Sequence, residues 1–350
     1  MGHSTVSMEE DIQMQTKVAT EAPVLAVQGL KVWFRDARGQ PLRAVESLDL
    51  TVARGEILCV VGESGCGKSV AALSVMGLLA RPGEIVAGSI SLCGRELVGL
   101  PEAEMVRVRG EGVAMVFQQP KASLNPVKRI GSQIAEQFIR HRRLSRADAW
   151  KRSLELLERV GIPNVAEKAR AYPHQLSGGQ AQRVMIAMAI ALEPRLLIAD
   201  EPTTALDSTV QAQILELLRE LCRESGTALV LVTHDLGVAA QMADRVAVMY
   251  AGRVVEIASV DDFFDAPAHP YSRGLLEALP RLGHLKDRLA DIPGSVPQQR
   301  TAPVGCSFSA RCDSRDRAGR ERCDGAVPPL ITSGHGGVCC WLAAAPKAAA

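Results

Sequence analysis

The run GESGCGKS, Gly62 to Ser69, combines residue types and a spacing that can bind phosphate. It fits G-x-x-x-x-G-K-[ST], follows the apolar run EILCVV and opens the helix-like run SVAALSVMGLL. In that setting backbone N–H groups turn inward around phosphate oxygens, and the start of the helix adds partial positive charge. We expect Lys68 to reach the β- and γ-phosphates of a nucleotide and the Ser69 hydroxyl to bind Mg²⁺. The residues predicted to contact the nucleotide here are Gly62, Glu63, Ser64, Gly65, Cys66, Gly67, Lys68, Ser69 and Val70.

Two acidic residues end another apolar run, LLIADE (196–201). A strand that ends in Asp200 places its carboxylate at the C-terminal edge of a sheet, where ligands of such sheets bind. We expect Asp200 to hold Mg²⁺ and Glu201 to polarise the attacking water. By itself the run DEP could simply begin a turn, but together with a phosphate loop it favours a nucleotide hydrolase.

Both motifs need a sheet to position them, and the sequence predicts one. The runs VLAVQGLKVWF and RAVESLDLTV alternate like half-buried strands, and EILCVV, LLIAD and ALVLVT are typical of fully buried strands. Helical patterns separate the later buried runs, so we expect an α/β fold with a mainly parallel sheet. Beyond Gly99 apolar residues recur at helical spacing, as in Ile130, Ile134 and Phe138, which predicts a helical subdomain inserted at about 100–178.

The chain divides into three predicted parts. Residues 1–22 are polar and acidic, and we expect them to form a disordered extension. Residues 23–266 contain the phosphate loop, the strands and the inserted helices. Residues 267–350 are rich in Pro, Gly, Arg and Cys, and we expect them to form a separate small C-terminal module.

Composition excludes several classes of function. A net charge of +1 leaves no basic excess for nucleic acid, and aromatic residues, at 3%, are too few for a surface that stacks bases. No run reaches the roughly 18 apolar residues of a membrane span. The N-terminus lacks the basic and apolar regions of a signal peptide. We therefore expect a cytosolic protein that serves a membrane, if at all, from the surface.

Further runs resemble the ATP-binding cassette (ABC) ATPases. LSGGQ (176–180) is similar to the family signature, VFQQP to the Q-loop, ALD (205–207) to the D-loop and VTHD to the switch region. They occur in the family's order between residues 24 and 260. The resemblance implies a P-loop ATPase with a RecA-like core, a small antiparallel β subdomain and an inserted helical subdomain. It also implies nucleotide contacts for Phe34, Gln118, Ser177, Gly178, Gly179, Gln180 and Asp207.

In this family two ATPase domains dimerise head to tail and hold each ATP between the P-loop of one domain and the signature of the other. The resemblance implies that Ser177 and its neighbours face a partner's nucleotide. ATP then binds the closed dimer better than the open one, and hydrolysis removes that difference, which can drive a coupled motion. The resemblance assigns Mg²⁺ to Ser69, Gln118 and Asp200, and catalysis to Glu201, His234 and Lys68.

The runs around these motifs narrow the resemblance to one group of importers. VFQQPKASLNPVKRIGSQIAEQ, VAVMYAGRVVE and HPYSRGLLEALPRL look like the ATPases of dipeptide, oligopeptide and nickel importers. SVAALSVMGLL looks like the first, D-type, of the two unlike ATPases that these importers pair. The likeness implies a second ATPase, two permeases and an extracytoplasmic solute-binding protein, at the cytoplasmic face of a bacterial inner membrane. KASLNPV is a candidate permease-docking loop. Peptides are the first choice of solute, with nickel chelates, glutathione and oligosaccharides as alternatives.

ABC ATPases without a transporter form the competing class. Those of DNA repair, chromosome maintenance and translation predict long coiled coils, zinc-finger inserts or two cassettes in one chain, and this sequence has none of these. A regulator with a dead cassette is a third hypothesis. Because Lys68, Asp200, Glu201 and His234 are all present, we expect an active transport ATPase.

Five of the nine cysteines lie in the last fifth of the chain. Five, ten and sixteen residues separate Cys306, Cys312, Cys323 and Cys340. Their segment is poor in apolar residues, so it needs a cross-link or a bound metal to stabilise its fold. A reducing cytosol disfavours disulfides. The spacing leaves a [4Fe–4S] cluster, zinc and no cofactor open. Similar tails in peptide-importer ATPases look like [4Fe–4S] modules, which implies a cluster on these four cysteines, with Cys339 as competitor for the last position.

Overall fold

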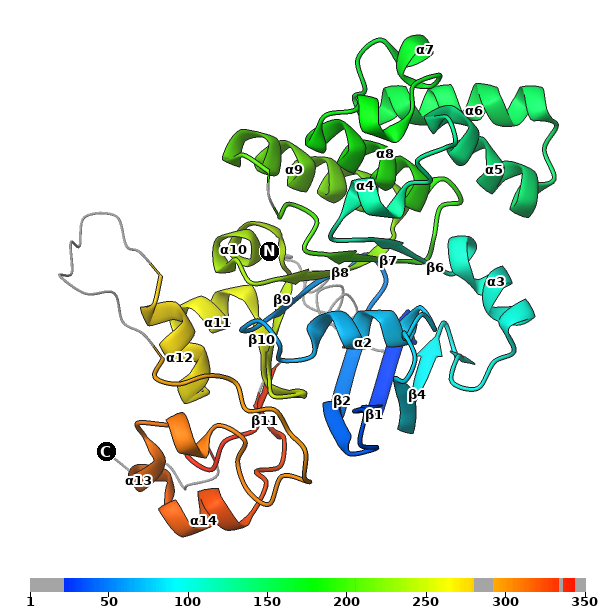
Figure 1. Cartoon of the computed structure of the whole chain (residues 1–350). Coiled ribbons are helices and arrows are strands. Elements are labelled where there is room, and N and C mark those ends of the chain that lie inside the picture. Colours follow the sequence, from blue (N-terminus) through cyan, green and yellow to red (C-terminus); the bar gives the residue numbers. More distant parts are fainter. Residues whose placement is uncertain (1–21, 205, 280–291, 334–335, 344–350) are drawn as a thin grey trace, which may run out of the picture.

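One mixed sheet of twelve strands connects most parts of the chain (Figure 1). The computed structural model describes residues 22–204, 206–279, 292–333 and 336–343, so the predicted N-terminal extension lies almost wholly outside the described residues. The strands are β1 (Leu25–Arg35), β2 (Pro41–Val52), β3 (Ile57–Val61), β4 (Glu84–Leu92), β5 (Arg95–Glu96), β6 (Val113–Val116), β7 (Leu196–Asp200), β8 (Ala228–Thr233), β9 (Arg245–Tyr250), β10 (Arg253–Ser259), β11 (Ile331–Ser333) and β12 (Gly336–Val338).

The half of the sheet around β3 is parallel. β3 pairs with β8 on one side and β9 on the other, β8 pairs with β7, and β7 pairs with β6. Every residue of β3, β7 and β8 is buried, as expected for strands that are covered on both faces. The predicted α/β class is confirmed, and the runs EILCVV, LLIAD and ALVLVT form its parallel strands.

The other half is antiparallel. Its strands follow the order β5-β4-β1-β2, and a single parallel pairing of Arg253 with Ser47 connects β2 to β10. The two alternating runs of the N-terminal region form β1 and β2, as predicted. This half corresponds to the small antiparallel β subdomain that the resemblance implied.

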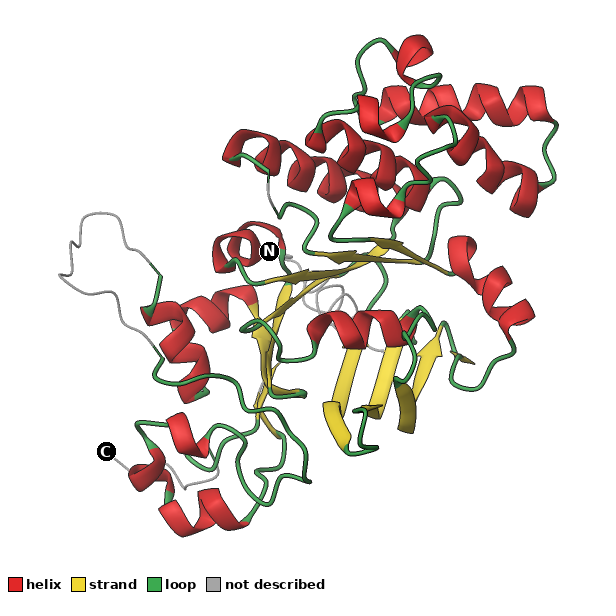
Figure 2. Cartoon of the chain, in the orientation of Figure 1, coloured by secondary structure: helices red, strands yellow, loops and turns green. Residues whose placement is uncertain are grey.

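Helices cover both faces of the parallel strands (Figure 2). None of the helices in the described residues has the length and apolarity to cross a bilayer. The helices are α2 (Lys68–Val75), α3 (Glu102–Glu111), α4 (Pro120–Ser123), α5 (Ile130–Arg142), α6 (Arg146–Arg159), α7 (Val165–Lys168), α8 (Gly178–Ile190), α9 (Ser208–Ser225), α10 (Leu236–Met242), α11 (Val260–Asp265), α12 (Pro270–Glu277), α13 (Arg315–Ala318) and α14 (Arg320–Gly325).

Alternate residues of β3 face two different layers. Ile57, Cys59 and Val61 pack in one core cluster with residues of α8 and α9, whereas Leu58 and Val60 pack in a second cluster with residues of α2. Successive side chains of a strand point to opposite faces of a sheet. α2 and α8 therefore lie on opposite faces, as Figure 1 also shows.

The inserted helical region begins differently from the prediction. The stretch 100–178 contains α3 to α7, but it also contains β6, which is the edge strand of the parallel sheet beside β7. The four residues of β6 are all buried. A run of four apolar residues carries no periodicity that separates a strand from a helix, so the prediction missed this strand. The helices beyond α4 form the insertion proper.

The C-terminal segment is less separate than the sequence suggested. β12 pairs antiparallel with β10, so the segment extends the sheet of the cassette. Phe308 is buried within the same core cluster as α8 and α9. The described part of the segment is thus anchored to the rest of the chain by backbone hydrogen bonds and by apolar packing.

A buried histidine starts α12 beside β10. His269 Nδ1 accepts a hydrogen bond from the N–H of Tyr271 at 3.0 Å. The Glu256 carboxylate accepts from the N–H groups of Ala268 and His269, at 2.7 and 2.8 Å. Burial and the Arg273 guanidinium lower the pKa of His269 to about 3. The imidazole therefore stays neutral above that pH, which keeps Nδ1 available as the acceptor that caps the helix.

We expect acid to destabilise the protein through His269. The unfolded chain binds a proton near pH 6.5, whereas the folded state resists protonation down to about pH 3. The contribution of His269 is therefore complete above pH 6.5 and falls as the pH drops below it, by about 2 kcal/mol at pH 5. Urea unfolding of wild type and His269→Asn, whose amide caps without titrating, measures this difference. Equal pH dependence of the two proteins would contradict the assignment.

Candidate active site

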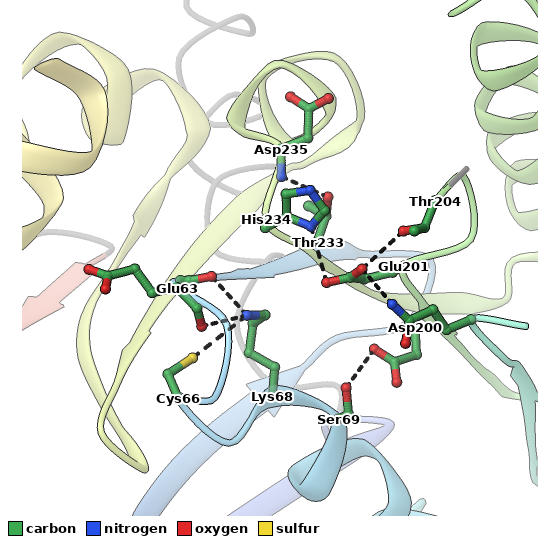
Figure 3. Close-up of polar contacts among 12 residues, drawn as sticks. Glu63, Cys66, Lys68, Ser69, Asp200, Glu201, Thr204, Thr233, His234 and Asp235 are labelled. Atoms are coloured by element: carbon green, nitrogen blue, oxygen red, sulfur yellow. Dashed lines mark hydrogen bonds and ion pairs between the residues drawn. The ribbon is translucent and has the colours of Figure 1, made fainter. Parts of the chain in front are cut away.

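The predicted chemistry converges at the C-terminal ends of four parallel strands (Figure 3). Lys68 follows β3, Asp200 ends β7, His234 follows β8, and Gln118 follows β6. Parallel strands end at the same edge of a sheet, and ligands of open α/β sheets bind outside that edge. Residues up to 166 positions apart in the chain therefore share one site.

Two glycines give the phosphate loop its shape. Gly62 and Gly67 have φ angles of 151° and 105°. A Cβ atom would lie 2.2 Å from the carbonyl oxygen of Met249 at position 62, and 2.4 Å from that of Ala44 at position 67. No side chain fits at either position, so the loop can pack against β9 and β2 only with glycine.

The Lys68 ammonium lies inside this loop. Its exposed fraction is 6%, and Nζ donates to the carbonyl oxygens of Gly62 and Glu63 at 2.7 and 3.0 Å (Figure 3). A weaker contact joins Nζ to Cys66 Sγ at 3.7 Å. Burial raises the pKa of Cys66, so its thiol stays neutral and serves packing. Lys68 thus presents a buried cation to the space that the loop encloses.

Ser69 and Asp200 offer the oxygen ligands of a magnesium site. Ser69 Oγ donates to Asp200 Oδ1 at 3.1 Å, so a hydroxyl from α2 and a carboxylate from β7 converge. Burial raises the pKa of Asp200, and the adjacent Glu201 charge adds to the rise. A cation would offset both effects, and hydroxyl and carboxylate oxygens suit Mg²⁺. These two residues therefore fit the implied metal, which would neutralise phosphate charge when bound.

Glu201 is the centre of the remaining contacts. Its Oε2 accepts from Gln118 Nε2 at 2.8 Å and from Thr204 Oγ1 at 2.9 Å, and its Oε1 lies 3.1 Å from His234 Nδ1. Burial alone would raise the pKa of Glu201, but the hydrogen bonds of His234 and Thr204 and the Lys68 charge outweigh it and lower the pKa. The backbone at Glu201 has φ 46°, an uncommon conformation for a residue with a side chain. The carboxylate is therefore ionised and oriented.

The Q-loop glutamine makes its contact with Glu201. The structure brings Gln118 to the predicted site, but its amide nitrogen donates to the Glu201 carboxylate. Its assignment as a ligand of Mg²⁺ remains a prediction.

The signature lies away from this cluster. Ser177 caps α8 by accepting from the Gln180 N–H at 3.2 Å, and Gln180 Oε1 accepts from the Ser177 N–H. A Cβ at Gly179 would lie 2.8 Å from Val210 Cγ1, so glycine allows α8 to pack closely on α9. Because α8 and α2 cover opposite faces of the sheet, the signature and the phosphate loop of one chain do not form one site.

Two other predicted nucleotide contacts have local packing partners. Phe34 packs against Gly83, where a Cβ atom would approach its ring to 2.6 Å. Its neighbour Trp33 lies under the Arg43 guanidinium, 4.3 Å from the ring centroid. Asp207 caps α9 by accepting from the N–H of Val210 at 2.9 Å. Their roles toward a nucleotide stay predictions.

Sequence reasoning missed three residues that touch the site. Thr204 donates to Glu201, Tyr271 accepts from the Glu63 N–H at 2.9 Å, and Arg311 contacts the Glu63 carboxylate at 3.2 Å. Thr204 lies next to the DEP run, so its proximity was a usable signal. Tyr271 and Arg311 lie more than 200 residues from Glu63, and no local pattern connects them to it.

The C-terminal cysteines lie close together, but they do not form a metal site as placed. Burial raises the pKa of Cys306 to about 11, and the thiols of Cys340, Cys323 and Cys312 add to the rise. Burial also raises the pKa of Cys339 to about 11, where Asp49 and Cys340 add to the rise and Arg253 opposes it. Among the described residues no three His, Cys, Asp or Glu side chains approach closely enough to hold a metal ion.

Known proteins resemble this chain along most of its length. Residues 45–204 match the ABC transporter family, and residues 255–318 match the C-terminal region of oligopeptide/dipeptide transporters. A peptide import ATP-binding protein of Brucella melitensis is 49% identical over 91% of this chain and 96% of its own length. The oligopeptide transport ATP-binding protein OppD of Haemophilus influenzae is 47% identical, over 92% of this chain and 98% of its own length.

Solved cassettes share the fold. A dimeric ATP-binding cassette in a post-hydrolysis state, bound to ADP and Pi, superimposes with a TM-score of 0.61 and 29% identity. It covers 67% of this chain and 98% of its own length. The phosphate loop, the Glu201 cluster and these similarities together lead to one assignment. The chain belongs to the ABC transporter family of ATPases and carries the C-terminal region of its oligopeptide/dipeptide branch.

Proposed function

We propose that this chain is the ATP-hydrolysing subunit of a peptide importer. The observation that carries the proposal is the Glu201 cluster, beside the phosphate loop, in a chain whose C-terminal region matches peptide transporters. The relatives named for peptide import support the solute class. In this proposal the chain pairs with a second ATPase on the cytoplasmic face of the membrane. The pair drives two permeases that a solute-binding protein supplies.

The side chains of this cluster divide the steps of hydrolysis among them. Lys68 and the loop N–H groups hold the phosphates, while Ser69 and Asp200 hold Mg²⁺, which neutralises charge. The ionised Glu201 accepts a hydrogen bond from the attacking water and orients it. His234 contacts Glu201 through Nδ1 and is proposed to contact the γ-phosphate as well. Gln118 connects the Glu201 carboxylate to the helical region, so loss of the γ-phosphate is proposed to move that region.

Replacement of Glu201 tests its proposed role in hydrolysis. Glu201→Gln keeps the shape of the side chain and removes its charge, so we expect MgATP binding to remain while turnover falls by about 100-fold or more. Phosphate release by the assembled importer measures turnover, and a fluorescent ATP analogue measures binding. Glu224→Gln is the matched control, because Glu224 lies on α9 in an exposed pair with Arg159. Turnover of Glu201→Gln at the wild-type rate would refute the role of Glu201.

The loop after α4 is the proposed permease contact. Gln133 holds it from inside: its Oε1 accepts from the Asn125 N–H at 2.8 Å, and its Nε2 donates to the carbonyls of Asn125 and Lys128. Val127 projects from this braced loop with an exposed fraction of 80%. A rigid loop with an exposed apolar tip suits a docking surface. The loop follows β6, Gln118 and α4 in the chain, so it is placed to transmit nucleotide-dependent motion.

Replacement of Val127 tests whether this loop contacts the permease. Val127→Asp should lower solute uptake by about tenfold or more, because a charge replaces an apolar contact in the interface, while MgATP affinity is retained. Uptake of a labelled peptide into vesicles, with ATP binding measured in parallel, separates the two effects. Val304→Asp is the control, since Val304 is 75% exposed in the C-terminal segment. Equal uptake by the two variants would count against docking at Val127.

A [4Fe–4S] cluster on Cys306, Cys312, Cys323 and Cys340 is a separate proposal. It is supported by the influence of the Cys340, Cys323 and Cys312 thiols on Cys306. Against it stands the absence of a group of three metal ligands among the described residues. Thiolates must form before metal binds, so the raised pKa values predict tighter binding as pH rises.

The adjacent residues Cys339 and Cys340 provide matched variants that test the cluster. Anaerobically purified wild type should contain iron and acid-labile sulfide, and Cys340→Ser should lose both. Cys339→Ser should keep both, because the thiols that raise the pKa of Cys306 are those of Cys340, Cys323 and Cys312. Iron-free wild type that is well folded would eliminate the cluster, and identical iron loss in both variants would eliminate the choice of Cys340.

A further inference from the structure

The C-terminal segment reaches into the phosphate loop. Glu63, the second residue of that loop, donates its N–H to Tyr271 Oη at 2.9 Å, and its Oε2 lies 3.2 Å from Arg311 Nη1. These partners lie 208 and 248 residues further along the chain. We propose that Arg311, with Tyr271, is a positioning residue of ATP binding, which holds Glu63 and neutralises its charge beside the phosphate site.

Arg311 is held independently of Glu63. Its guanidinium donates to the carbonyls of Ile292, Pro293 and Gly294, at 3.0, 2.8 and 3.3 Å. The side chain is only 8% exposed. A planar guanidinium has five N–H donors in a rigid fork, so three carbonyls can fix it while the two N–H groups of Nη1 remain for Glu63 and for the Tyr250 hydroxyl, at 3.4 Å. The position of the cation is therefore set before a nucleotide arrives.

An aromatic cluster fixes the loop that contains Arg311. Phe308 contacts Tyr250 and Tyr271 with ring centroids 5.2 and 5.3 Å apart, and the two tyrosines lie 4.7 Å from each other. Phe308 and Arg311 both belong to the short loop between Cys306 and Cys312. This loop thus inserts one apolar and one charged side chain next to the loop that binds phosphate.

The charge of Glu63 needs this partner. Its Oε1 is buried and has no hydrogen-bond partner, and Arg311 is the one ion-pair partner of this carboxylate among the described residues. The backbone carbonyl of the same residue accepts from Lys68 Nζ at 3.0 Å. The Glu63 carboxylate itself points away from Lys68 (Figure 3), so without Arg311 the side chain would lose its anchor and leave an uncompensated negative charge on the phosphate loop, which weakens the loop's attraction for phosphate.

Docking of the segment does not depend on Arg311. The pairing of β12 with β10 joins the two parts, and so does the hydrogen bond from the Arg43 N–H to the carbonyl of Gln299 at 2.8 Å. An exposed ion pair between Arg300 and Asp36, at 2.7 Å, adds a third connection. Because these contacts remain, the loss of Arg311 should act on Glu63 rather than detach the segment.

The test measures binding of a fluorescent ATP analogue to the full-length chain in the presence of Mg²⁺. Arg311→Ala should raise the Kd about tenfold, the typical effect of one charged hydrogen bond. Adding Glu63→Gln to that variant should bring the Kd back to within about twofold of wild type, since the unpaired charge is gone. Arg300→Ala is the matched control, and its Kd should equal that of wild type.

A purely structural role for Arg311 gives a different result. Arg311→Ala and Arg300→Ala would then both lower the melting temperature and leave the Kd unchanged, or Glu63→Gln would fail to restore binding in the double variant. Either outcome overturns the proposal. If Arg311→Ala does not fold, Arg311→Lys carries the test, because it keeps the charge but cannot hold three carbonyls and Glu63 together. Its Kd should rise less than tenfold, and an unchanged Kd would also overturn the proposal.

Discussion

The parallel pairing of β3 with β8, and of β8 with β7, is the constraint on which the site depends. Parallel neighbours end at the same edge, so three loops that are remote in sequence must leave the sheet side by side. The register brings Val61 opposite Thr233 and Asp200 opposite Val232. The phosphate loop, the acidic pair and the switch histidine follow directly from these positions, and no large loop movement is needed to assemble them.

Two adjacent carboxylates behave differently at this edge. The pKa of Asp200 is raised, mainly by burial, whereas the hydrogen bonds of His234 and Thr204 keep the pKa of Glu201 low in spite of burial. Neighbouring carboxyls whose pKa values are pushed apart can take separate roles. Asp200, next to the Ser69 hydroxyl, suits a cation, while Glu201 stays ionised and is held by three side chains. The geometry thus suits the proposed division between metal binding at Asp200 and orientation of water at Glu201.

The sheet also separates the phosphate loop from the signature. The phosphate loop packs with α2 on one face, and the signature starts α8 on the other. A chain built in this way cannot close its own signature over its own phosphate loop. This arrangement supports the head-to-tail dimer, and it explains why Ser177 makes only local capping contacts within the described residues.

The sequence by itself determined the local parts. The phosphate loop, the buried strands and the capped signature helix depend on residues within about ten positions of each other, so their patterns are readable in one run. Only the tertiary structure decided the contacts of Glu63 with Arg311 and the place of β6. These depend on which distant surfaces pack together. Neither a lone arginine nor a run of four apolar residues carries a local signal that selects a distant partner.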